Sequence, residues 1–463
     1  MDNIPYSQVD LIREVFHYQS RFEGSTMVFK IDYPVTEESG FPGLVKDLAL
    51  LAQTGFKVII VPGAKENIDA VLKQHNIETS RFSDFSDFSD GASIYDSPVR
   101  FTTSQAIPYV EMAAFDVAGR FMTFLSGSRV DALIGNFVRA RGLGVKNGVD
   151  TEHTGVVDKI YADSLGRVLN LGMVPILPCI GWSPSGKPYN VPSDEIALAV
   201  SSALGAAKLF VVSVHDRLRS DILTLPANLE TRPDGSLIRL TPQQAETLIA
   251  DNSKLPGLND DETAVCRQYL REIKLGLRAS RAGVHRVHII DGREEGAVLK
   301  ELFSNLGVGT MIYTDEYDSI RAFHSRDLPD VLRLMEPLMQ KGVLVRRNPE
   351  QIQENKDDYI VLEIDGTIRA CGALHDWGES QGEIAAVATD PQYTDIGLGR
   401  QIVGFLVEKA RKSRMSRVFV LTTQTQDWFE SLGFKETALE TLPDQKRNVY
   451  DKSRKSKVFA LEL

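Results

Sequence analysis

The stretch Gly382-Glu383-Ile384-Ala385-Ala386-Val387-Ala388-Thr389-Asp390-Pro391, followed by Gly397-Leu398-Gly399-Arg400, decides how the last third of this chain folds. The first segment is typical of a buried strand that carries one carboxylate, and the second of a glycine-rich turn that opens a helix. The bare N–H groups of a helix N-terminus bind pyrophosphate readily. A lone Glu on the preceding strand lies where a base would serve such a ligand. The combination indicates acyl transfer from a donor with a nucleotide tail.

Composition sets the class of protein. The 463 residues are 43% hydrophobic and 25% charged, which is ordinary globular usage and enough chain for two or three domains. The net charge of −11 argues against a nucleic-acid or membrane partner. Three widely spaced cysteines suit a reducing compartment, and their spacing indicates no metal site. With no targeting or membrane-spanning segment in the sequence, we expect a cytoplasmic protein.

Two α/β domains are expected, 1–314 and 315–463, with the junction in a polar stretch at Tyr313–Ser319. In the first domain, apolar runs alternate with amphipathic helices, which predicts a mostly parallel open sheet with flanking helices. The helices include Leu44–Thr54 and Asp194–Leu204. The expected strands are Met27–Ile31, Val58–Pro62, Val174–Ile180, Leu209–Val214 and Val287–Ile290.

The second domain is predicted to begin with a strand at Ile320–Phe323 and a helix at Leu328–Leu338. A hairpin follows, Asp358–Ile364 and Arg369–His375, turning at the Asp-Gly pair 365–366. After the Glu383 strand, the expected elements are a helix at Leu398–Lys412, a strand at Val418–Leu421, a helix at Gln426–Leu432 and a strand near Lys457–Leu461.

This order of elements resembles the GCN5-related N-acetyltransferase (GNAT) fold, an α/β fold whose cofactor loop reads Q/R-x-x-G-x-G/A. Here the loop is Thr394-Asp395-Ile396-Gly397-Leu398-Gly399, so both glycines match and Thr394 departs from the pattern. The resemblance implies acetyl-CoA as cosubstrate, with no metal. Its expected contacts are Val387, Ala388, Gly397, Leu398, Gly399 and Arg400.

Segments near the end of the chain resemble one particular family within this fold. Val418–Thr423, Asp427-Trp428-Phe429, Leu432-Gly433-Phe434 and the tail Leu442–Val458 resemble the bacterial-type N-acetylglutamate synthase family, as does Leu344-Val345-Arg346-Arg347. That family transfers acetyl to the α-amino group of L-glutamate in the first step of arginine biosynthesis. Glutamate carries two carboxylates, and clustered cations hold carboxylates well. The residues expected to bind it are Arg346, Lys446, Arg447 and Arg454.

Glu383 is the only ionisable side chain in an apolar strand and is the expected general base. A backbone N–H near Val387 is expected to hold the oxyanion. Thr422 matches a family position near the reaction centre, and Tyr450 is a second option for the group that assists the leaving thiolate. Cys371 has no His beside it in the sequence, so we expect direct transfer without an acyl-enzyme.

The first domain resembles the amino-acid kinase fold. The segments that carry the resemblance are Gly144–Asp150, His153-Thr154-Gly155, Tyr189-Asn190-Val191 with Asp194, and Ala203–Leu209. Active kinases of this fold place Lys-x-Gly-Gly on the first strand, where this chain has Lys30-Ile31-Asp32-Tyr33. Both glycines are missing and a carboxylate is added, which blocks and repels phosphates. The domain is therefore expected to regulate rather than to phosphorylate.

Arginine-inhibited relatives bind L-arginine between a mobile N-terminal helix and the last helix of this domain. Arg13 and Tyr18 match the first of these elements, and Glu301 with Gly307-Val308-Gly309-Thr310 the second. Tyr18, Glu301, Gly307 and Gly309 are the expected arginine contacts, with Glu301 available to pair with the guanidinium. The resemblance also implies a homo-oligomer, a tetramer or a hexamer.

Other interpretations stay open at this point. The chain is alternatively a bifunctional synthase and kinase, a non-catalytic arginine sensor, or a protein acetyltransferase. Asn190 and Asp194 match the amino-acid kinase fold, and the simpler interpretation is that they are residues inherited with that fold and have no remaining role in ligand binding. A threefold Phe-Ser-Asp repeat at 82–90 reads as a partner-binding loop or, more simply, as a surface insertion.

Overall fold

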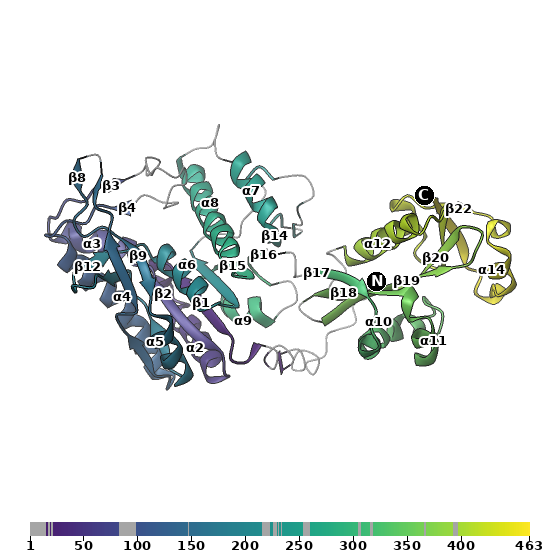
Figure 1. Cartoon of the computed structure of the whole chain (residues 1–463), viewed down its shortest axis with the longest axis horizontal. Coiled ribbons are helices and arrows are strands. Elements are labelled where there is room, and N and C mark those ends of the chain that lie inside the picture. The colour runs from purple at the N-terminus through teal and green to yellow at the C-terminus, as the bar shows by residue number, and fades with distance from the viewer. Residues whose placement is uncertain are drawn as a thin grey trace. The chain divides into compact units, whose positions relative to one another are not determined.

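The computed structural model of the 463-residue chain forms two compact units, and the boundary along the chain lies between Thr314 and Asp315 (Figure 1). Each unit is an α/β fold with its own sheet and core. The Phe-Ser-Asp repeat lies outside the described residues except at its first residue, Phe82. The structure describes residues 15–16, 19, 22–82, 99–146, 148–214, 223–225, 229, 231–232, 234–252, 260–303, 307–314, 318–364, 367–391 and 397–463.

The first unit is built on an eight-stranded sheet of order β14-β16-β15-β13-β1-β2-β10-β5. Its centre is β1 (Thr26–Ile31), which runs parallel to β2 (Lys57–Pro62) and β13 (Lys208–Ser213). One antiparallel pair, β15–β16, interrupts the parallel order, so the predicted mostly parallel sheet is confirmed. The outer strands are β15 (Arg286–Asp291), β16 (Thr310–Tyr313), β14 (Arg239–Leu240), β10 (Val174–Ile176) and β5 (Ala132–Ile134).

Helices cover both faces of this sheet. Alternate residues of its strands therefore pack into two different cores. On β1, Met27 and Phe29 pack into one core, and Val28 into the other. A strand buried on both faces reads as a continuous apolar run, which is why these runs are visible in the sequence. The helices that pack into the first core are α2 (Phe41–Gln53), α3 (Lys65–Gln74), α4 (Ile107–Gly127) and α9 (Ala297–Phe303). Those that pack into the second core are α5 (Ala162–Asn170), α6 (Ser193–Ala203), α7 (Pro242–Asp251) and α8 (Asp260–Arg281).

One predicted strand, Val174–Ile180, is wrong. It forms two strands, β10 in the main sheet and β11 (Ile180–Trp182) in a separate four-stranded sheet of order β12-β11-β6-β9. Pro178 lies between them, and it has no backbone N–H to continue a ladder. The apolar run therefore changes sheets at the proline. The partners of β11 are β12 (Pro188–Asn190), β6 (Val138–Gly142) and β9 (Gly155–Ile160).

The second unit is built on a seven-stranded sheet of order β17-β18-β19-β20-β21-β23-β22. The strands β17 (Asp318–Ala322), β18 (Tyr359–Ile364), β19 (Thr367–Asp376) and β20 (Gln381–Thr389) are antiparallel in turn. β20 then pairs in parallel with β21 (Arg417–Thr422). The remaining elements are β22 (Lys435–Thr437), β23 (Lys457–Glu462), α11 (Pro349–Glu354), α13 (Gln426–Ser431) and α14 (Asp444–Asn448).

Two longer helices lie on opposite faces of this sheet (Figure 1). α10 (Leu328–Gln340) shares a core with Cys371 and Ala373 of β19. α12 (Leu398–Lys412) packs on the other face, where a Cβ at Gly372 would lie 2.6 Å from the Ile402 side chain. A glycine is required there because the helix approaches the strand so closely. The predicted bounds of α12 are confirmed.

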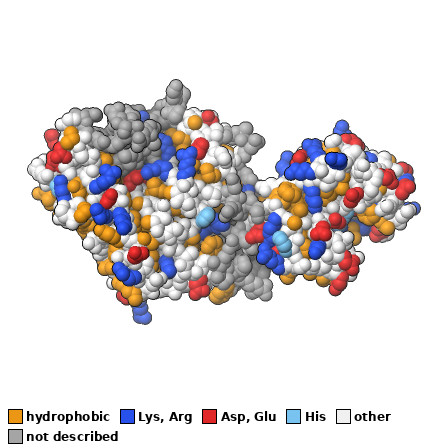
Figure 2. All heavy atoms as spheres, in the orientation of Figure 1, with side chains coloured by type: hydrophobic (Ala, Val, Ile, Leu, Met, Phe, Trp, Pro, Cys, Tyr) orange, Lys and Arg blue, Asp and Glu red, His pale blue; other side chains and the backbone are white. Residues whose placement is uncertain are grey.

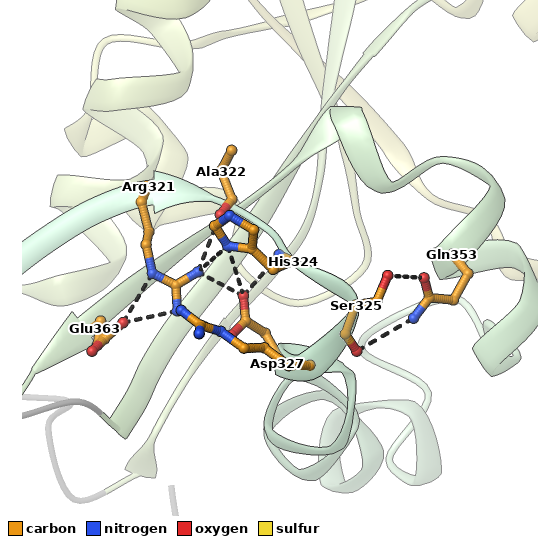
Figure 3. Close-up of polar contacts among 8 residues, drawn as sticks. Arg321, Ala322, His324, Ser325, Asp327, Gln353 and Glu363 are labelled. Carbon is orange, nitrogen blue, oxygen red and sulfur yellow. Dashed lines mark hydrogen bonds and ion pairs between the residues drawn. The ribbon is translucent and has the colours of Figure 1, made fainter.

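A partly buried ion-pair network fixes the first strand of this unit (Figure 3). The Arg321 guanidinium donates to Glu363 on β18 and to both carboxylate oxygens of Asp327, at 2.6 and 3.0 Å. Burial alone would raise the pKa of Asp327, but the hydrogen bonds from Arg321 and the His324 amide outweigh it and lower that pKa. The network ties β17 to the turn that starts α10 (Figure 3).

On the face that Figure 2 shows, basic and acidic side chains are interspersed over each unit, with apolar patches between them. This face therefore carries both signs of charge over each unit. No helix in the described ranges is both long and apolar enough to span a bilayer.

Candidate active site

The sheet of the second unit opens between its two central parallel strands. In the described residues, pairing of β20 with β21 ends at Glu383 and Phe419, although β20 continues to Thr389 and β21 to Thr422. A register shift against β19 accompanies the opening, and Ala386 adopts a positive φ of 54°. Such a bulge bends a strand away from its neighbour. The opening exposes a strand edge whose backbone groups can bind an extended ligand.

Glu383 lies where the pairing ends. Its side chain is buried, with a relative exposure of 7%. The Lys446 ammonium on α14 lies 2.7 Å from its Oε2 atom, and the Trp377 indole N–H donates to the same oxygen at 2.8 Å. The Lys446 ammonium also lies 4.7 Å from the Trp377 ring centroid. A carboxylate buried this deeply needs such partners, because burying an unpaired charge is costly.

The two oxygens of this carboxylate are not equivalent. Oε2 holds both donors, whereas Oε1 accepts no hydrogen bond from any residue of the described ranges. Directly across the ladder lies His375, whose Nδ1 atom is 2.6 Å from Asp358. The carboxylate therefore keeps one oxygen available for a proton.

The basic side chains predicted to bind the substrate differ in their contacts. Lys446 reaches Glu383, as described above. Arg454 donates to the carbonyls of Gly342 and Val343 at 2.9 and 3.1 Å, in the segment that leads to the exposed Arg346. Arg447 is exposed and pairs with Asp444 in its own helix. Only Lys446 therefore contacts the predicted base directly.

Thr422 lies at the end of β21 on the opposite face of the sheet from Glu383. Glu383 is paired with Phe419, and facing residues share a side, so Leu421 lies with Glu383 and Thr422 on the other face. The Thr422 hydroxyl accepts the backbone N–H of Thr425 at 3.0 Å and contacts the Thr425 hydroxyl at 2.7 Å.

Two further hydroxyls belong to this unit. The other predicted option, Tyr450, donates its hydroxyl to the Ser456 carbonyl at 2.7 Å. Thr423, which the sequence did not single out, has a buried hydroxyl without a hydrogen-bond partner in the described residues. Thr422 is the last residue of β21, at the end that lies beyond the pairing with β20, and Thr423 follows it directly.

The predicted cofactor loop is described from Gly397 onward, and Thr394 lies outside the described residues. Gly397 precedes α12 with a φ of 75°, a conformation that favours glycine. A Cβ at Gly399 would lie 3.1 Å from the Trp428 ring. Leu398 is buried and Arg400 exposed at this helix N-terminus. On β20, Ala388 is buried and Val387 half-buried.

The predicted arginine contacts of the first unit also meet, except Tyr18 and Arg13, which lie outside the described residues. Glu301 of α9 is buried, and its Oε2 accepts the backbone N–H groups of Val308 and Gly309 at 2.7 and 2.8 Å. A Cβ at Gly307 would lie 2.4 Å from this Glu301 oxygen. The carboxylate that was expected to be available for a guanidinium is thus already hydrogen-bonded inside the protein.

Residues that the sequence reading missed complete this cluster. His288 of β15 lies 2.6 Å from the second Glu301 oxygen, and its other ring nitrogen is 3.3 Å from the Lys208 ammonium. Burial and the adjacent Lys208 lower the pKa of His288 to about 4, against the opposing pull of Glu301. The Arg232 guanidinium donates to the carbonyls of Gly307 and Gly309 at 3.3 and 2.9 Å. A lone His in the apolar run Val287–Ile290 was the available sequence signal.

In the first unit, the lysine at the kinase-like position is paired with carboxylates of the protein itself. The Lys30 ammonium, 1% exposed, lies 2.7 Å from Asp32 and 2.9 Å from Asp194. The Arg271 guanidinium is 3.4 Å from Asp32. Burial alone would lower the pKa of Lys30, but Asp194 and Asp32 outweigh it and raise that pKa. Lys30, which would hold phosphates in a kinase, is instead neutralised within the protein.

Comparison with known proteins agrees with this division. An amino acid kinase family model matches residues 34–221, and an acetyltransferase (GNAT) family model matches 328–434. The fold and the site thus define a GNAT acetyltransferase joined to an amino-acid kinase fold. The chain is 30% identical to the amino-acid acetyltransferases of Escherichia coli K12 and Shigella flexneri, over 98% of this chain and 98% of each relative. It belongs to the amino-acid acetyltransferase family.

Two solved structures match this chain over nearly its whole length. N-acetylglutamate synthase from Neisseria gonorrhoeae, complexed with coenzyme A and L-arginine, superposes with a TM-score of 0.79 at 29% identity, covering 99% of this chain and 100% of that one. The same enzyme complexed with coenzyme A and N-acetyl-glutamate gives a TM-score of 0.57 at 30% identity, with the same coverage.

Proposed function

We propose that this protein is an N-acetylglutamate synthase, which transfers acetyl from acetyl-CoA to the α-amino group of L-glutamate in the cytoplasm as the first step of arginine biosynthesis. The observation that carries the proposal is the buried Glu383 at the mouth of the β20–β21 opening, paired with Lys446. The full-length similarity to a synthase solved with coenzyme A and N-acetyl-glutamate supports the choice of substrates.

Catalysis begins with deprotonation of the substrate amine. The ammonium group of glutamate loses a proton to Oε1 of Glu383, directly or through one water. The freed nitrogen attacks the thioester carbonyl carbon, and a backbone N–H at the bulge near Val387 stabilises the oxyanion. When the tetrahedral intermediate collapses, the C–S bond breaks, and the second proton of the attacking nitrogen passes to the departing sulfur, so that CoA leaves as the thiol. No acyl-enzyme forms, since Cys371 is buried and its thiol pKa is raised by burial to about 12.

The opening accounts for how two substrates meet. Glu383 and Thr422 lie on opposite faces of the sheet and on opposite sides of the gap. The amine approaches from the Glu383 face. The thioester, with its pyrophosphate at the α12 N-terminus among Gly397, Leu398, Gly399 and Arg400, lies on the other. A hydroxyl at the end of β21, from Thr422 or Thr423, then stabilises the departing sulfur.

Cations hold the two carboxylates of glutamate. We assign one to Lys446, which exchanges its ion pair with Glu383 for the substrate. Arg454 and Arg346, joined through the 342–346 segment, take the other, and Arg447 supplies positive charge at the rim. Lys446 thereby links substrate arrival to release of the base.

The first unit, residues 1–314, is proposed to be an arginine-responsive regulatory domain without kinase activity. The pairing of Lys30 with Asp32 and Asp194 supports the loss of phosphoryl transfer. The cluster of Glu301, His288 and the Gly307–Gly309 segment supports a ligand site at α9, completed by Tyr18. We expect L-arginine to inhibit through this site in a homo-oligomer, a tetramer or a hexamer.

The test is thiol release from acetyl-CoA by the purified full-length protein, with and without L-glutamate, then with L-arginine added. Release that requires glutamate and falls with arginine supports both assignments. Release that arginine does not change keeps the synthase and removes the regulatory assignment. No release, from folded protein that binds arginine, would favour a non-catalytic sensor and end the proposal. ATP-dependent phosphorylation of N-acetylglutamate would indicate a bifunctional enzyme.

A further inference from the structure

Trp377 holds the predicted base from a tightly constrained turn. The turn joins β19 to β20, and Gly378, Glu379 and Ser380 all have positive φ values, between 53° and 75°. The Trp377 amide donates to the Gln381 carbonyl at 3.2 Å. From this position the indole N–H donates to Glu383 Oε2 at 2.8 Å.

The ring of Trp377 is fixed as well. It packs against a core cluster of Phe419, Leu442, Val458 and Ala460, and it faces the Lys446 ammonium at 4.7 Å. The turn also contacts α14, since the Asp444 amide donates to the Glu379 carboxylate at 3.2 Å. An indole has two rotatable side-chain bonds and a single donor, so a packed ring aims its N–H in one direction.

We propose that Trp377 is a positioning residue for acetyl transfer: its indole N–H fixes Glu383 Oε2 so that Oε1 faces the substrate amine when Lys446 leaves to bind glutamate. This rests on the synthase function proposed above. Lys446 is a changing partner, because the substrate's carboxylate competes for it. His375 does not replace it: within the described residues it makes no hydrogen bond to Glu383, and its Nδ1 atom is engaged by Asp358. Trp377 is thus the donor that stays while the substrate binds.

The physical reason is preorganisation. A general base must hold its accepting atom within hydrogen-bond reach of the proton, and small misplacements cost rate steeply. Without a fixed donor, the Glu383 carboxylate would rotate once Lys446 moves to the substrate. Either of its oxygens would then face the ammonium group of glutamate. The N–H therefore acts in the turnover step and not in substrate binding.

The experiment separates the N–H from the ring in the full-length protein. Trp377→Phe keeps an aromatic face for Lys446 and removes the donor. Replacement of Trp377 by 3-benzothienylalanine keeps the bicyclic shape and exchanges only N–H for sulfur. Trp377→Ala removes both features. Trp182→Phe in the first unit is the matched control. The measurements are kcat and KM for both substrates, with acetyl-CoA binding by calorimetry as a readout apart from turnover.

For Trp377→Phe and the benzothienyl variant we expect kcat to fall roughly 10- to 100-fold, the effect of losing one hydrogen bond to a charged group. Both KM values and acetyl-CoA binding should stay within about twofold of the wild type. Trp377→Ala should in addition raise the KM for glutamate, because Lys446 loses its support. The control should match the wild type.

A benzothienyl variant with kcat within about twofold of the wild type would overturn the proposal, even if Trp377→Phe failed to fold. A rise in the KM for glutamate with unchanged kcat would also overturn it, since the ring alone would then matter. An inactive wild type, by contrast, identifies failure of the synthase assignment itself.

Discussion

The two units each bury a lysine against carboxylates, yet the two sites differ in what they leave available. In the first unit, Lys30 contacts Asp32 and Asp194, and Arg271 completes a cluster of two cations and two anions. In the second, Lys446 and Glu383 lie at the end of a strand pairing, and Glu383 keeps one oxygen without a partner in the described residues. An ion pair whose cation is buried among several partners holds a fold together, whereas one at an opening can exchange its partner for a substrate.

The sharpest way to test the open site is Glu383→Gln, which keeps the shape and removes the base. We expect kcat to fall roughly 100-fold or more, with little change in acetyl-CoA affinity. Rapid-quench turnover and calorimetry measure the two quantities. Glu354→Gln, an exposed glutamate on α11 away from the site, is the matched control. Unchanged turnover would remove Glu383 from its role.

The closed site should respond in stability instead. Asp32→Asn leaves the buried Lys30 with one paired carboxylate instead of two, and we expect the free energy of unfolding of the first unit to fall by about 2 kcal/mol. Acetyl transfer should be unchanged at temperatures where both proteins are folded. Asp158→Asn, which breaks the more exposed pair with Arg139, should change stability little. Denaturant unfolding measures the free energy of unfolding of both variants. An equal loss of stability in both would show that the Lys30 cluster contributes no more than an exposed ion pair.

Lys446 tests whether the open pair exchanges partners. Lys446→Met keeps the side-chain stem, and we expect the KM for glutamate to rise roughly tenfold through loss of a carboxylate contact. The KM for acetyl-CoA should hold. Lys455→Met, an exposed lysine in the same tail, serves as control. If both KM values rise together, Lys446 supports the fold of the site and not glutamate binding.

Local pattern predicted the elements well and the contacts poorly. The helix at 398–412 was predictable because Gly397 stands before an amphipathic run, and Glu383 because it interrupts an apolar strand. Lys446 meets Glu383 across 63 residues, a contact set by how α14 folds back. No periodicity encodes such a contact. Trp377 is near Glu383 in sequence, but the direction of its indole depends on the turn and on the packing of its ring.

The smallest expected effect lies in the first unit, where His288 is buried between Lys208 and Glu301. Its pKa is lowered to about 4 by burial and Lys208, below the usual value near 6.5, so the folded state stays unprotonated where the unfolded chain takes up a proton. Because the unfolded state binds more protons there, stability is lost as pH falls from about 6.5 toward 4.

His288→Gln should remove that part of the pH dependence, a slope of at most about 1.4 kcal/mol per pH unit, in denaturant unfolding followed at several pH values. His285→Gln, an exposed histidine before the same strand, should keep it. A slope that persists in His288→Gln would assign the acid sensitivity to the carboxylates instead. Since His288 holds Glu301, the same variant shows whether the arginine response depends on this pair: relief of inhibition with normal synthesis would place His288 in the regulatory site, whereas loss of both would show that it only supports the fold.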